Sequence, residues 1–466
     1  MSELTEALPP RPAAAERHAR SHAAIFRFWA PLSAQWLMMG LEGPFLAAVI
    51  ARMGDPTFNL AAYGVAFAFA ILVESPVIML MSASTALVED AASYRRLRNF
   101  ANALNAGATA LLLLVLAPPV YDAIMSGMLA LPPAVAALTY TALWILLPWP
   151  AAIGYRRFLH GVLIRSGRTR LVAYGTLVRL LGMSGTALAL YGTTSLPGAW
   201  VGAAALSAGV CVEALATRVM AIPALRELGL PPLLRTTPQG LAPSTADGAP
   251  PGYGELLRFY YPLALTSFIV LAVNPLLTFF MGRAPAPVES LAVFPVVHSL
   301  SFLFRSFGFS YQEAAIALLG RRLENAARLA RFGAILALAS SGAMALVAFT
   351  PLADFWFVTV SGLPPELARL AILPTRILVP LCALAVLLSL QQAVLVQGRE
   401  TRPITVASGV EVLGIALLFP LLGWGAGMTG VSAATLALLG GRLAGNGYLS
   451  GPVGRVLRRY RGARFW

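Results

Sequence analysis

The sequence predicts an all-α, polytopic membrane protein of about twelve transmembrane helices, arranged as two parallel six-helix repeats. Three observations support this. The composition is 58% hydrophobic and only 12% charged, whereas soluble domains are about 25% charged. Apolar runs of spanning length recur between clusters of arginine. The second half of the chain repeats the pattern of the first.

A transmembrane helix needs about 20 predominantly apolar residues. Twelve such runs are bounded by arginine clusters or by Pro/Gly turns, and each is expected to form one span. The twelve expected spans are Phe26–Ala51, Leu60–Val88, Phe100–Met125, Val135–Ile164, Leu171–Gly192, Ala199–Ile222, Leu256–Met281, Val288–Leu319, Ala330–Trp356, Leu367–Val396, Ile404–Leu422 and Met428–Tyr448.

The arginines predict the orientation. Every basic residue is arginine, and the net charge is +14. One set of gaps between spans is rich in arginine, whereas the alternate gaps hold little beyond Arg52, Arg283 and Arg369. The positive-inside rule then places both termini in the cytoplasm and the protein in the bacterial inner membrane. Because the arginines cluster in these gaps, no nucleic-acid partner is expected. The arginine-rich gaps hold Arg95, Arg96, Arg98, Arg165, Arg168, Arg170, Arg226, Arg235, Arg321, Arg322, Arg328, Arg331, Arg399 and Arg402, and the C-terminal tail adds Arg455, Arg458, Arg459, Arg461 and Arg464.

The domain organisation follows from these spans. Residues 1–24 are polar and Ala/Pro-rich, lack the apolar core of a cleavable signal, and are expected to be a disordered cytoplasmic tail. Residues 25–222 form the first six-helix bundle and residues 254–450 the second. A Pro/Gly/Thr-rich cytoplasmic linker, 223–253, joins them, and residues 451–466 form a basic tail.

The repeat is visible in matching motifs. Arg27-Phe28-Trp29-Ala30-Pro31-Leu32 corresponds to Arg258-Phe259-Tyr260-Tyr261-Pro262-Leu263 at one constant offset, and Arg52 then corresponds to Arg283. Because each repeat holds an even number of spans, both enter the membrane from the same side. Transporters of this plan bind substrate near the midplane between their halves.

Charges within the spans predict a polar cavity. A charge at the centre of a spanning helix costs roughly 2.5–3.5 kcal/mol, so such groups should face one another or a cavity. The repeat pairs Glu74 with Arg305 and Arg179 with Glu411, and these opposite charges could form ion pairs or line opposite walls of a cleft. The candidate cavity residues are Glu42, Glu74, Arg179, Glu213, His298, Arg305, Gln312, Arg376, Gln392 and Glu411.

Several polar residues have more than one interpretation. His298 could be a protonation switch or make an interhelical hydrogen bond. Gln312 and Gln392 could be cavity donors or bridge helices. Arg157 and His160, near the end of their helix, could contact substrate, but reaching the membrane interface is the favoured interpretation. Arg218 and Arg442 lie near helix ends and are expected to reach that interface.

Catalytic motifs are not evident. The sequence has no Walker A loop, no His-Glu-x-x-His and no metal-spaced cysteines, since Cys211 and Cys382 lie in separate spans. We therefore expect no enzyme activity, no catalytic residue, no metal and no cofactor. Transport would be driven by a gradient, with a proton or sodium ion as a possible coupling ion.

The whole transmembrane part resembles the multidrug and toxic compound extrusion (MATE) transporters and their wider exporter superfamily, and within it most closely the progressive ankylosis (ANK) branch. The stretches that carry the resemblance are Phe28-Trp29-Ala30-Pro31-Leu32, Ala62-Tyr63-Gly64-Val65-Ala66, Tyr261-Pro262-Leu263-Ala264-Leu265, Pro374-Thr375-Arg376-Ile377-Leu378 and Gly430-Val431-Ser432-Ala433-Ala434.

The resemblance implies a V-shaped pair of bundles that works by alternating access. MATE members export organic cations against sodium or protons, whereas the ANK branch is associated with export of citrate, pyrophosphate or nucleotides. Arg305 and Arg376 would suit an anion, and Glu42 stands where many MATE proteins carry an acidic residue.

The expected function is therefore export of a small organic anion by a monomer whose partners are its substrate and membrane lipid. The alternatives are a proton- or sodium-coupled multidrug exporter, a flippase for a lipid-linked precursor, and an integral membrane enzyme acting on lipid.

Overall fold

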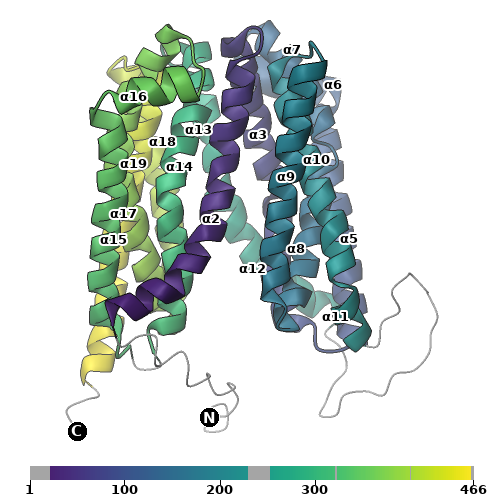
Figure 1. Cartoon of the computed structure of the whole chain (residues 1–466), viewed down its shortest axis with the longest axis vertical. Coiled ribbons are helices and arrows are strands. Elements are labelled where there is room, and N and C mark those ends of the chain that lie inside the picture. The colour runs from purple at the N-terminus through teal and green to yellow at the C-terminus, as the bar shows by residue number, and fades with distance from the viewer. Residues whose placement is uncertain (1–20, 229–251, 321–322, 399, 463–466) are drawn as a thin grey trace.

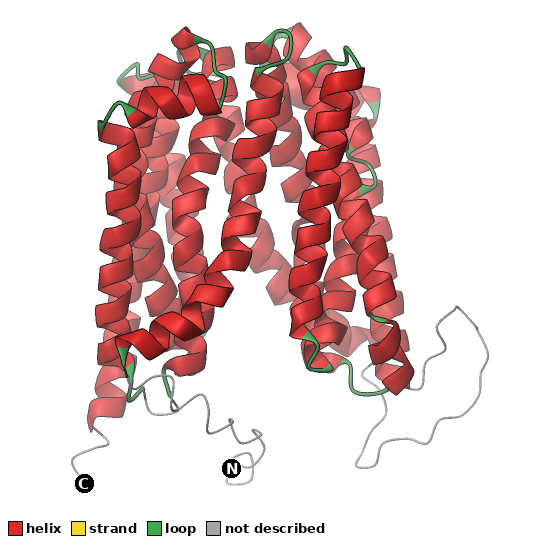
Figure 2. Ribbon diagram, viewed as in Figure 1, coloured by secondary structure: helices red, strands yellow, loops and turns green. Residues whose placement is uncertain are grey.

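The computed structural model describes residues 21–228, 252–320, 323–398 and 400–462, and every regular element within these ranges is a helix (Figure 2). The expected N-terminal tail lies mostly outside these ranges, as does most of the expected linker between the halves. The all-helical fold class predicted from the sequence is confirmed.

The first half of the chain forms the right-hand lobe of Figure 1, apart from its first helix, which crosses between the lobes. Its elements are α2 (His22–Ala51), α3 (Pro56–Ile78), α4 (Leu80–Leu87), α5 (Ala91–Leu116), α6 (Pro118–Asp122), the π-helix η1 (Ala123–Met128), α7 (Pro133–Ile145), α8 (Trp149–Arg165), α9 (Thr169–Thr193), α10 (Gly198–Met220) and α11 (Ile222–Glu227).

The second half forms the left-hand lobe, apart from its first helix, α12 (Tyr253–Leu271), which also crosses between the lobes. Its other elements are α13 (Val273–Met281), α14 (Pro287–Leu318), α15 (Ala326–Phe349), α16 (Leu352–Asp354), the π-helix η2 (Phe355–Val360), α17 (Pro365–Gln397), α18 (Arg402–Phe419), the π-helix η3 (Pro420–Gly425) and α19 (Gly430–Gly462).

By length and apolarity, ten helices of the described chain could cross a membrane, and the bent pair α7–α8 makes an eleventh span. The remaining expected span is α19, which is long enough but carries glycine, asparagine and Arg442 in its first half. Each of the twelve expected spans thus corresponds to one helix or to a run of consecutive helical elements.

Breaks inside the spans coincide with proline. The α7–α8 pair bends by 40°, at a break that contains Pro148 and is followed by Pro150. The break between α12 and α13 lies at Ala272, three residues before Pro275. Proline removes a backbone donor and clashes with the carbonyl four residues earlier, which explains a break at each place.

The first helix of each half crosses between the lobes. The Trp29 indole in the N-terminal part of α2 donates to the Ser310 hydroxyl of α14 at 2.9 Å, whereas the C-terminal part of α2 packs on α9 and α10. In α12 the Tyr260 hydroxyl donates to the Pro76 carbonyl of α3. Each six-helix unit of the sequence therefore contributes one helix to the other lobe.

The lobes diverge at one end and meet at the other (Figure 2). The diverging end is where α2 begins, where α11 lies and where α19 ends (Figure 1). Two expected boundaries also shift there. Helix α11 occupies the start of the expected linker, and α19 continues through residues assigned to the basic tail as far as Gly462.

Candidate functional site

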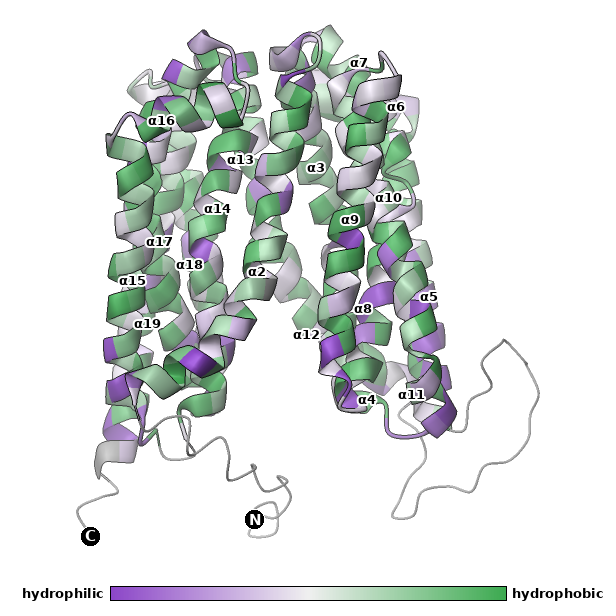
Figure 3. Ribbon diagram, in the orientation of Figure 1, coloured by the Kyte–Doolittle hydropathy of each residue, from purple (hydrophilic) through white to green (hydrophobic). Residues whose placement is uncertain are grey.

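A cavity of about 550 Å³ lies between the lobes and is lined by residues of both. Its charged walls carry five arginines and three glutamates. Hydrophilic positions interrupt the otherwise apolar α2, α9 and α14 midway along their length (Figure 3). The cavity is therefore the polar feature that the charges within the spans predicted.

The structure brings together most of the residues predicted to line a cavity. Eight of them line it, namely Glu42, Glu74, Arg179, His298, Arg305, Gln312, Gln392 and Glu411. Glu213 is fully buried behind the wall. Arg376 does not line the cavity. It is exposed on α17, where its guanidinium donates to the Ala348 carbonyl at 3.1 Å and lies 5.3 Å from the Phe349 ring.

The wall of the first lobe holds a buried cluster of two arginines and two glutamates. Arg179 of α9 contacts Glu42 of α2 through two hydrogen bonds, one of them 2.9 Å long. Arg156 of α8 contacts Glu213 of α10 at 2.6 Å, and Glu213 also lies 3.9 Å from Arg179. These opposite charges balance, which offsets the cost of burying them.

Glu74 of α3 is a cavity carboxylate with a neutral partner. The Trp149 indole donates a hydrogen bond to it. Among the described residues, no arginine or histidine nitrogen lies within 4.0 Å of its oxygens. Glu74 is therefore the cavity acid whose negative charge is least compensated.

The wall of the second lobe is also polar. Arg442 of α19 pairs with Glu411 of α18 at 2.8 Å. Arg305 of α14 lies 3.1 Å from Nε2 of His298 on the same helix. Since arginine can only donate, the imidazole nitrogen accepts and His298 is neutral here. His298 thus makes a hydrogen bond within α14, and not the interhelical one that was one of its two interpretations from the sequence.

Two cavity arginines, Arg157 and Arg305, have no carboxylate partner within 4.0 Å in the described parts of the chain. Both Nε atoms are buried without a hydrogen-bond partner. The Arg305 guanidinium lies 5.9 Å from the Phe302 ring, and Arg157 contacts the Met81 sulfur at 3.9 Å. One arginine from each lobe thus lines the cavity without an ion-pair partner.

The residues paired by the repeat do not bond to each other. Glu74 bonds to Trp149 and Arg305 to His298, while Arg179 bonds to Glu42 and Glu411 to Arg442. The sequence left two arrangements open for these opposite charges, ion pairs or opposite walls of one cleft. The structure shows the second.

Three cavity arginines were missed by the sequence analysis, namely Arg156, Arg157 and Arg442. Arg157 lies eight residues before the end of α8 at Arg165, or about 12 Å deeper along a helix, which is too far for a side chain to reach the interface. The position of Arg157 along its helix was therefore the sequence signal that could have assigned it to the cavity. His160 was also expected at the interface, but it is buried and lies 3.3 Å from the Thr217 hydroxyl.

At the closed end, equivalent arginines of the two repeats each contact the opposite lobe. Arg52, after α2, donates to the carbonyls of Thr359 and Val360 in η2 at 2.5 and 2.9 Å. Arg283, after α13, donates to the Gly127 carbonyl in η1 at 3.0 Å. Carbonyls at a helix C-terminus attract cations, so these two contacts, which we call the arginine latches, hold this end shut.

No group of His, Cys, Asp or Glu in the described residues could hold a metal ion.

Neither a family model nor a curated protein matches the sequence. Solved structures do match. An inward-facing multidrug resistance MATE family transporter of the MOP superfamily is 15% identical and has a TM-score of 0.63, over 91% of this chain and 96% of that one. The lipid II flippase MurJ, in an inward closed conformation, is 12% identical and has a TM-score of 0.68, over 92% and 90%.

A third match is a MOP superfamily transporter from Pyrococcus furiosus, in which the reverse polarity of the binding pocket suggests a different function. It is 16% identical, with a TM-score of 0.57, over 96% of this chain and 99% of that one. This chain therefore has a MATE-like fold, as the sequence predicted.

Proposed function

We propose that this protein is a secondary transporter that moves a small organic anion through the interlobe cavity by alternating access. The observation that carries the proposal is the pair of arginines, Arg157 and Arg305, that reach the cavity from opposite lobes without a carboxylate partner. Guanidinium groups bind carboxylate and phosphate through strong charge-assisted hydrogen bonds. A bound anion would compensate both charges at once.

The carboxylates argue against a cationic substrate. Glu42, Glu213 and Glu411 each have an arginine partner within 3.0 Å. Glu74 alone lacks one, and its carboxylate accepts from Trp149. A citrate-like or phosphorylated anion, as expected from the resemblance to the ANK branch, therefore fits this cavity better than an organic cation.

The shape supports alternating access with the cavity open to the cytoplasm. The lobes diverge at the end where the arginine-rich ends of α5, α9 and α19 lie, and the arginine latches close the other end. By the positive-inside rule the diverging end is cytoplasmic. We accordingly propose a monomer in the bacterial inner membrane, with both termini in the cytoplasm.

Glu74 is the proposed coupling residue, with a proton as the coupling ion and sodium as the alternative. A buried carboxylate without a cationic partner gains from taking up a proton. The Glu74→Gln change keeps an acceptor for Trp149 but cannot titrate. We expect it to remove the dependence of uptake on a pH gradient while anion binding persists. Unchanged proton dependence in this variant would rule out Glu74.

The experiment that tests the function is uptake into proteoliposomes of the purified protein. Citrate and a cationic dye are compared under proton and sodium gradients. We expect saturable citrate uptake, abolished in Arg305→Ala, and no dye uptake. Arg376 does not line the cavity, so Arg376→Gln is the matched control and should transport normally. Gradient-driven dye uptake without citrate uptake would instead make this a multidrug exporter.

A lipid-linked precursor is a second candidate, because a diphosphate would also satisfy Arg157 and Arg305 and because the fold matches MurJ with a TM-score of 0.68. Inhibition of citrate uptake by a polyprenyl diphosphate, but not by its polyprenyl alcohol, would favour the flippase. Absence of citrate transport together with tight diphosphate binding would establish it.

A further inference from the structure

The interlobe cavity contains one acid and two cations that no partner in the described chain neutralises. Three of its arginines form ion pairs with glutamates, namely Arg156 with Glu213, Arg179 with Glu42 and Arg442 with Glu411. These pairs cancel, which leaves Arg157, Arg305 and Glu74 in the charged lining. The cavity therefore carries one net positive charge while Glu74 is ionised.

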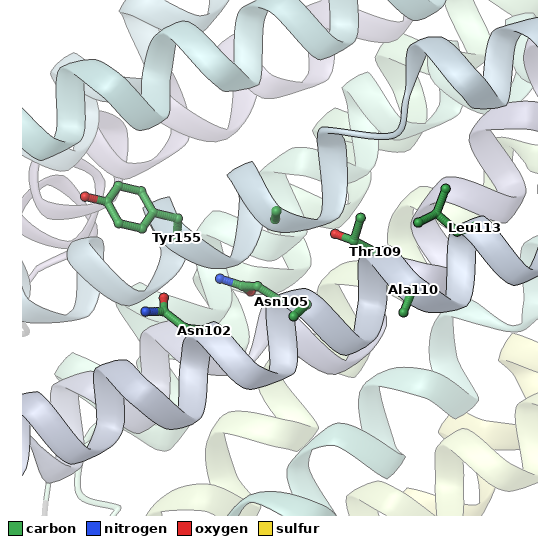
Figure 4. A pocket seen from close by; sticks show the side chains of 8 residues that line it. Asn102, Asn105, Thr109, Ala110, Leu113 and Tyr155 are labelled. Carbon is green, nitrogen blue, oxygen red and sulfur yellow. The ribbon is translucent and has the colours of Figure 1, made fainter.

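A second cavity, of about 620 Å³ between α5 and α8, lacks this arrangement (Figure 4). Its polar lining residues are Asn102, Asn105, Thr109 and Tyr155. Neither a carboxylate nor an arginine is among its described lining residues. A free acid and free cations thus face one common space at the interlobe cavity, and not at this one.

Glu74 lies close to one of the two unpaired arginines. It accepts from Trp149, the first residue of α8, and Ile153 and Arg157 follow on α8 at steps of four and line the same cavity. Residues four apart lie on one helix face. Arg157 is also the arginine with the largest electrostatic effect on Glu74. An anion bound at Arg157 therefore comes to lie within the field of the Glu74 carboxylate.

The other groups around Glu74 have partners of their own. Helix α3 packs against α2, α5, α7, α8, α10, α12, α13 and α14. Of these, α5, α7, α12 and α13 add no charged residue to the described cavity lining, and the Tyr260 hydroxyl of α12 donates to the Pro76 carbonyl. On α14, His298 accepts from Arg305 and is neutral. The remaining charged or titratable groups at this wall are Glu42, Tyr63, Arg156, His160, Arg179 and Glu213.

We propose that the protein carries an organic dianion together with one proton, which Glu74 takes up, an inference that rests on the anion site proposed above. An anion at Arg157 neutralises the nearest free cation and brings a like charge toward Glu74, and a like charge favours the protonated carboxyl. Protonation of Glu74 leaves two positive charges in the cavity, which a dianion balances. The loaded cavity is then neutral, which is the least costly state for a site that closes within the membrane.

The charge of the substrate sets the sign of this coupling. A cation would compete with the proton at Glu74 and be exchanged for it, whereas an anion and a proton each strengthen binding of the other. A sphere of about 550 Å³ is about 10 Å across, and two unit charges that far apart at an effective dielectric constant of about 20 change each other's binding about tenfold. The dianion and its proton carry one net negative charge, so an inside-negative membrane potential drives them outward.

Tartrate uptake into proteoliposomes of the full chain tests the proposal, because both tartrate carboxyl groups stay ionised near neutral pH. The external pH is held constant, the internal pH is either equal or more alkaline, and potassium with valinomycin clamps the membrane potential at zero. We expect the alkaline interior to accumulate tartrate, up to about tenfold for a tenfold proton gradient, as one proton per anion requires. Without a pH gradient, an inside-positive potential should also accumulate tartrate, because the cargo is negative.

Glu74→Gln keeps an acceptor for Trp149 but takes up no proton, so tartrate should equilibrate without accumulating in a pH gradient. The matched control is Glu313→Gln. Glu313 also accepts from an indole, that of Trp36 at 2.9 Å, but it does not line the cavity. This variant should accumulate tartrate as the wild type does.

Three results would overturn the proposed symport while leaving an anion transporter in place. They are accumulation driven by an acidic interior, no accumulation in either the pH gradient or the potential, and citrate uptake without any tartrate uptake. Accumulation that responds to the pH gradient but not to the potential would overturn the ratio of one proton to a dianion. Absence of citrate uptake under every gradient would instead overturn the proposed function itself.

Discussion

Arg156 and Arg157 illustrate how one residue type can have opposite roles in this protein. Arg156, next to Arg157, is neutralised by Glu213 at 2.6 Å and helps to hold α8 against α10. Arg157 points into the cavity and has no such partner. A buried charge without a partner is costly to fold around, so its presence is best explained by a ligand.

The proposed anion site makes a prediction at Arg157 and Arg305. Arg157→Gln and Arg305→Gln should each raise the half-saturating anion concentration about 10- to 100-fold, the loss expected for a hydrogen bond to a charged group. Isothermal titration of the detergent-solubilised protein measures it. Arg376→Gln serves as the control and should bind normally. Unchanged anion affinity in both cavity variants would rule out the proposed anion site.

A second residue-scale prediction concerns Asp90, which lies between the spans. Its side chain caps α5, accepting from the backbone of Ala92 at 3.0 Å and of Ser93 at 2.7 Å. Hydrogen bonding from the Ser93 backbone, followed by its hydroxyl, lowers the Asp90 pKa. A lowered pKa means that this stabilisation is complete above the unfolded-state value of about 3.9 and is lost as the pH falls through the folded-state value.

Asp90→Ala should therefore destabilise the protein by about 1 kcal/mol at pH 7 and by progressively less in acid. Asp90→Asn keeps an acceptor without a titrating charge, so its stability relative to Ala should depend little on pH. Melting temperatures measured from pH 7 down to pH 3 check this. A difference between wild type and Asp90→Ala that grows in acid would contradict the assignment.

At the scale of elements, the arginine latches connect each lobe to a π-helix of the other. The Arg52 latch depends on Gly362, which has a φ of +71° and has Arg52 atoms at 2.9–3.0 Å from the position that a Cβ would take. An alanine there would displace the guanidinium. Gly427 has a similar φ of +66° but no atom within 4 Å, so it offers a matched backbone control.

Gly362→Ala should open the closed end, whereas Gly427→Ala should not, although both place alanine at positive φ. The readout is labelling of a cysteine at Thr278, which lines the cavity on α13, by a membrane-impermeant maleimide added outside. Cys211 and Cys382 are first replaced by alanine. Faster labelling in Gly362→Ala alone is expected. Equal labelling in the two glycine variants would show that Arg52 is not a latch.

At the scale of the whole molecule, alternating access requires the two ends to move in opposite senses. Thr169 and Thr401 are exposed, repeat-equivalent residues at the diverging ends of the lobes, and Thr194 and Ala426 are exposed at the other end. Spin labels on each pair report the separation of the lobes. Adding substrate to the Gly362→Ala variant should shorten the first distance and lengthen the second. If both distances lengthened or both shortened, the lobes would be separating or approaching as a whole, and alternating access would be contradicted.

The crossing of α2 and α12 gives this motion a physical route. Trp29 fixes the start of α2 to α14, while the end of α2 packs in the first lobe. A helix anchored in both lobes has to bend when they rock, and α2 contains Pro31 and Pro44. Proline lacks the backbone hydrogen bond that would resist bending.

Much of this could be predicted from the sequence, because lipid imposes strong rules on a chain. Apolar runs of fixed length and the arginine distribution predicted the helices and their common orientation, and the repeated motif predicted the paired lobes. The cost of charge in hydrocarbon was enough to nominate Glu42, Arg179 and Arg305 for a cavity.

Only the tertiary structure decided which charges meet. Side-chain direction around a helix separates Arg156 from Arg157, although they are adjacent and chemically identical. Depth in the bundle placed Arg442 in the cavity, and packing on α15 placed Arg376 outside it. Composition and period were sufficient to predict the two-lobed helical fold, because burial of apolar surface depends on both. Tertiary packing decided the site, because pairing of charges depends on distances of a few ångströms between helices far apart in the chain.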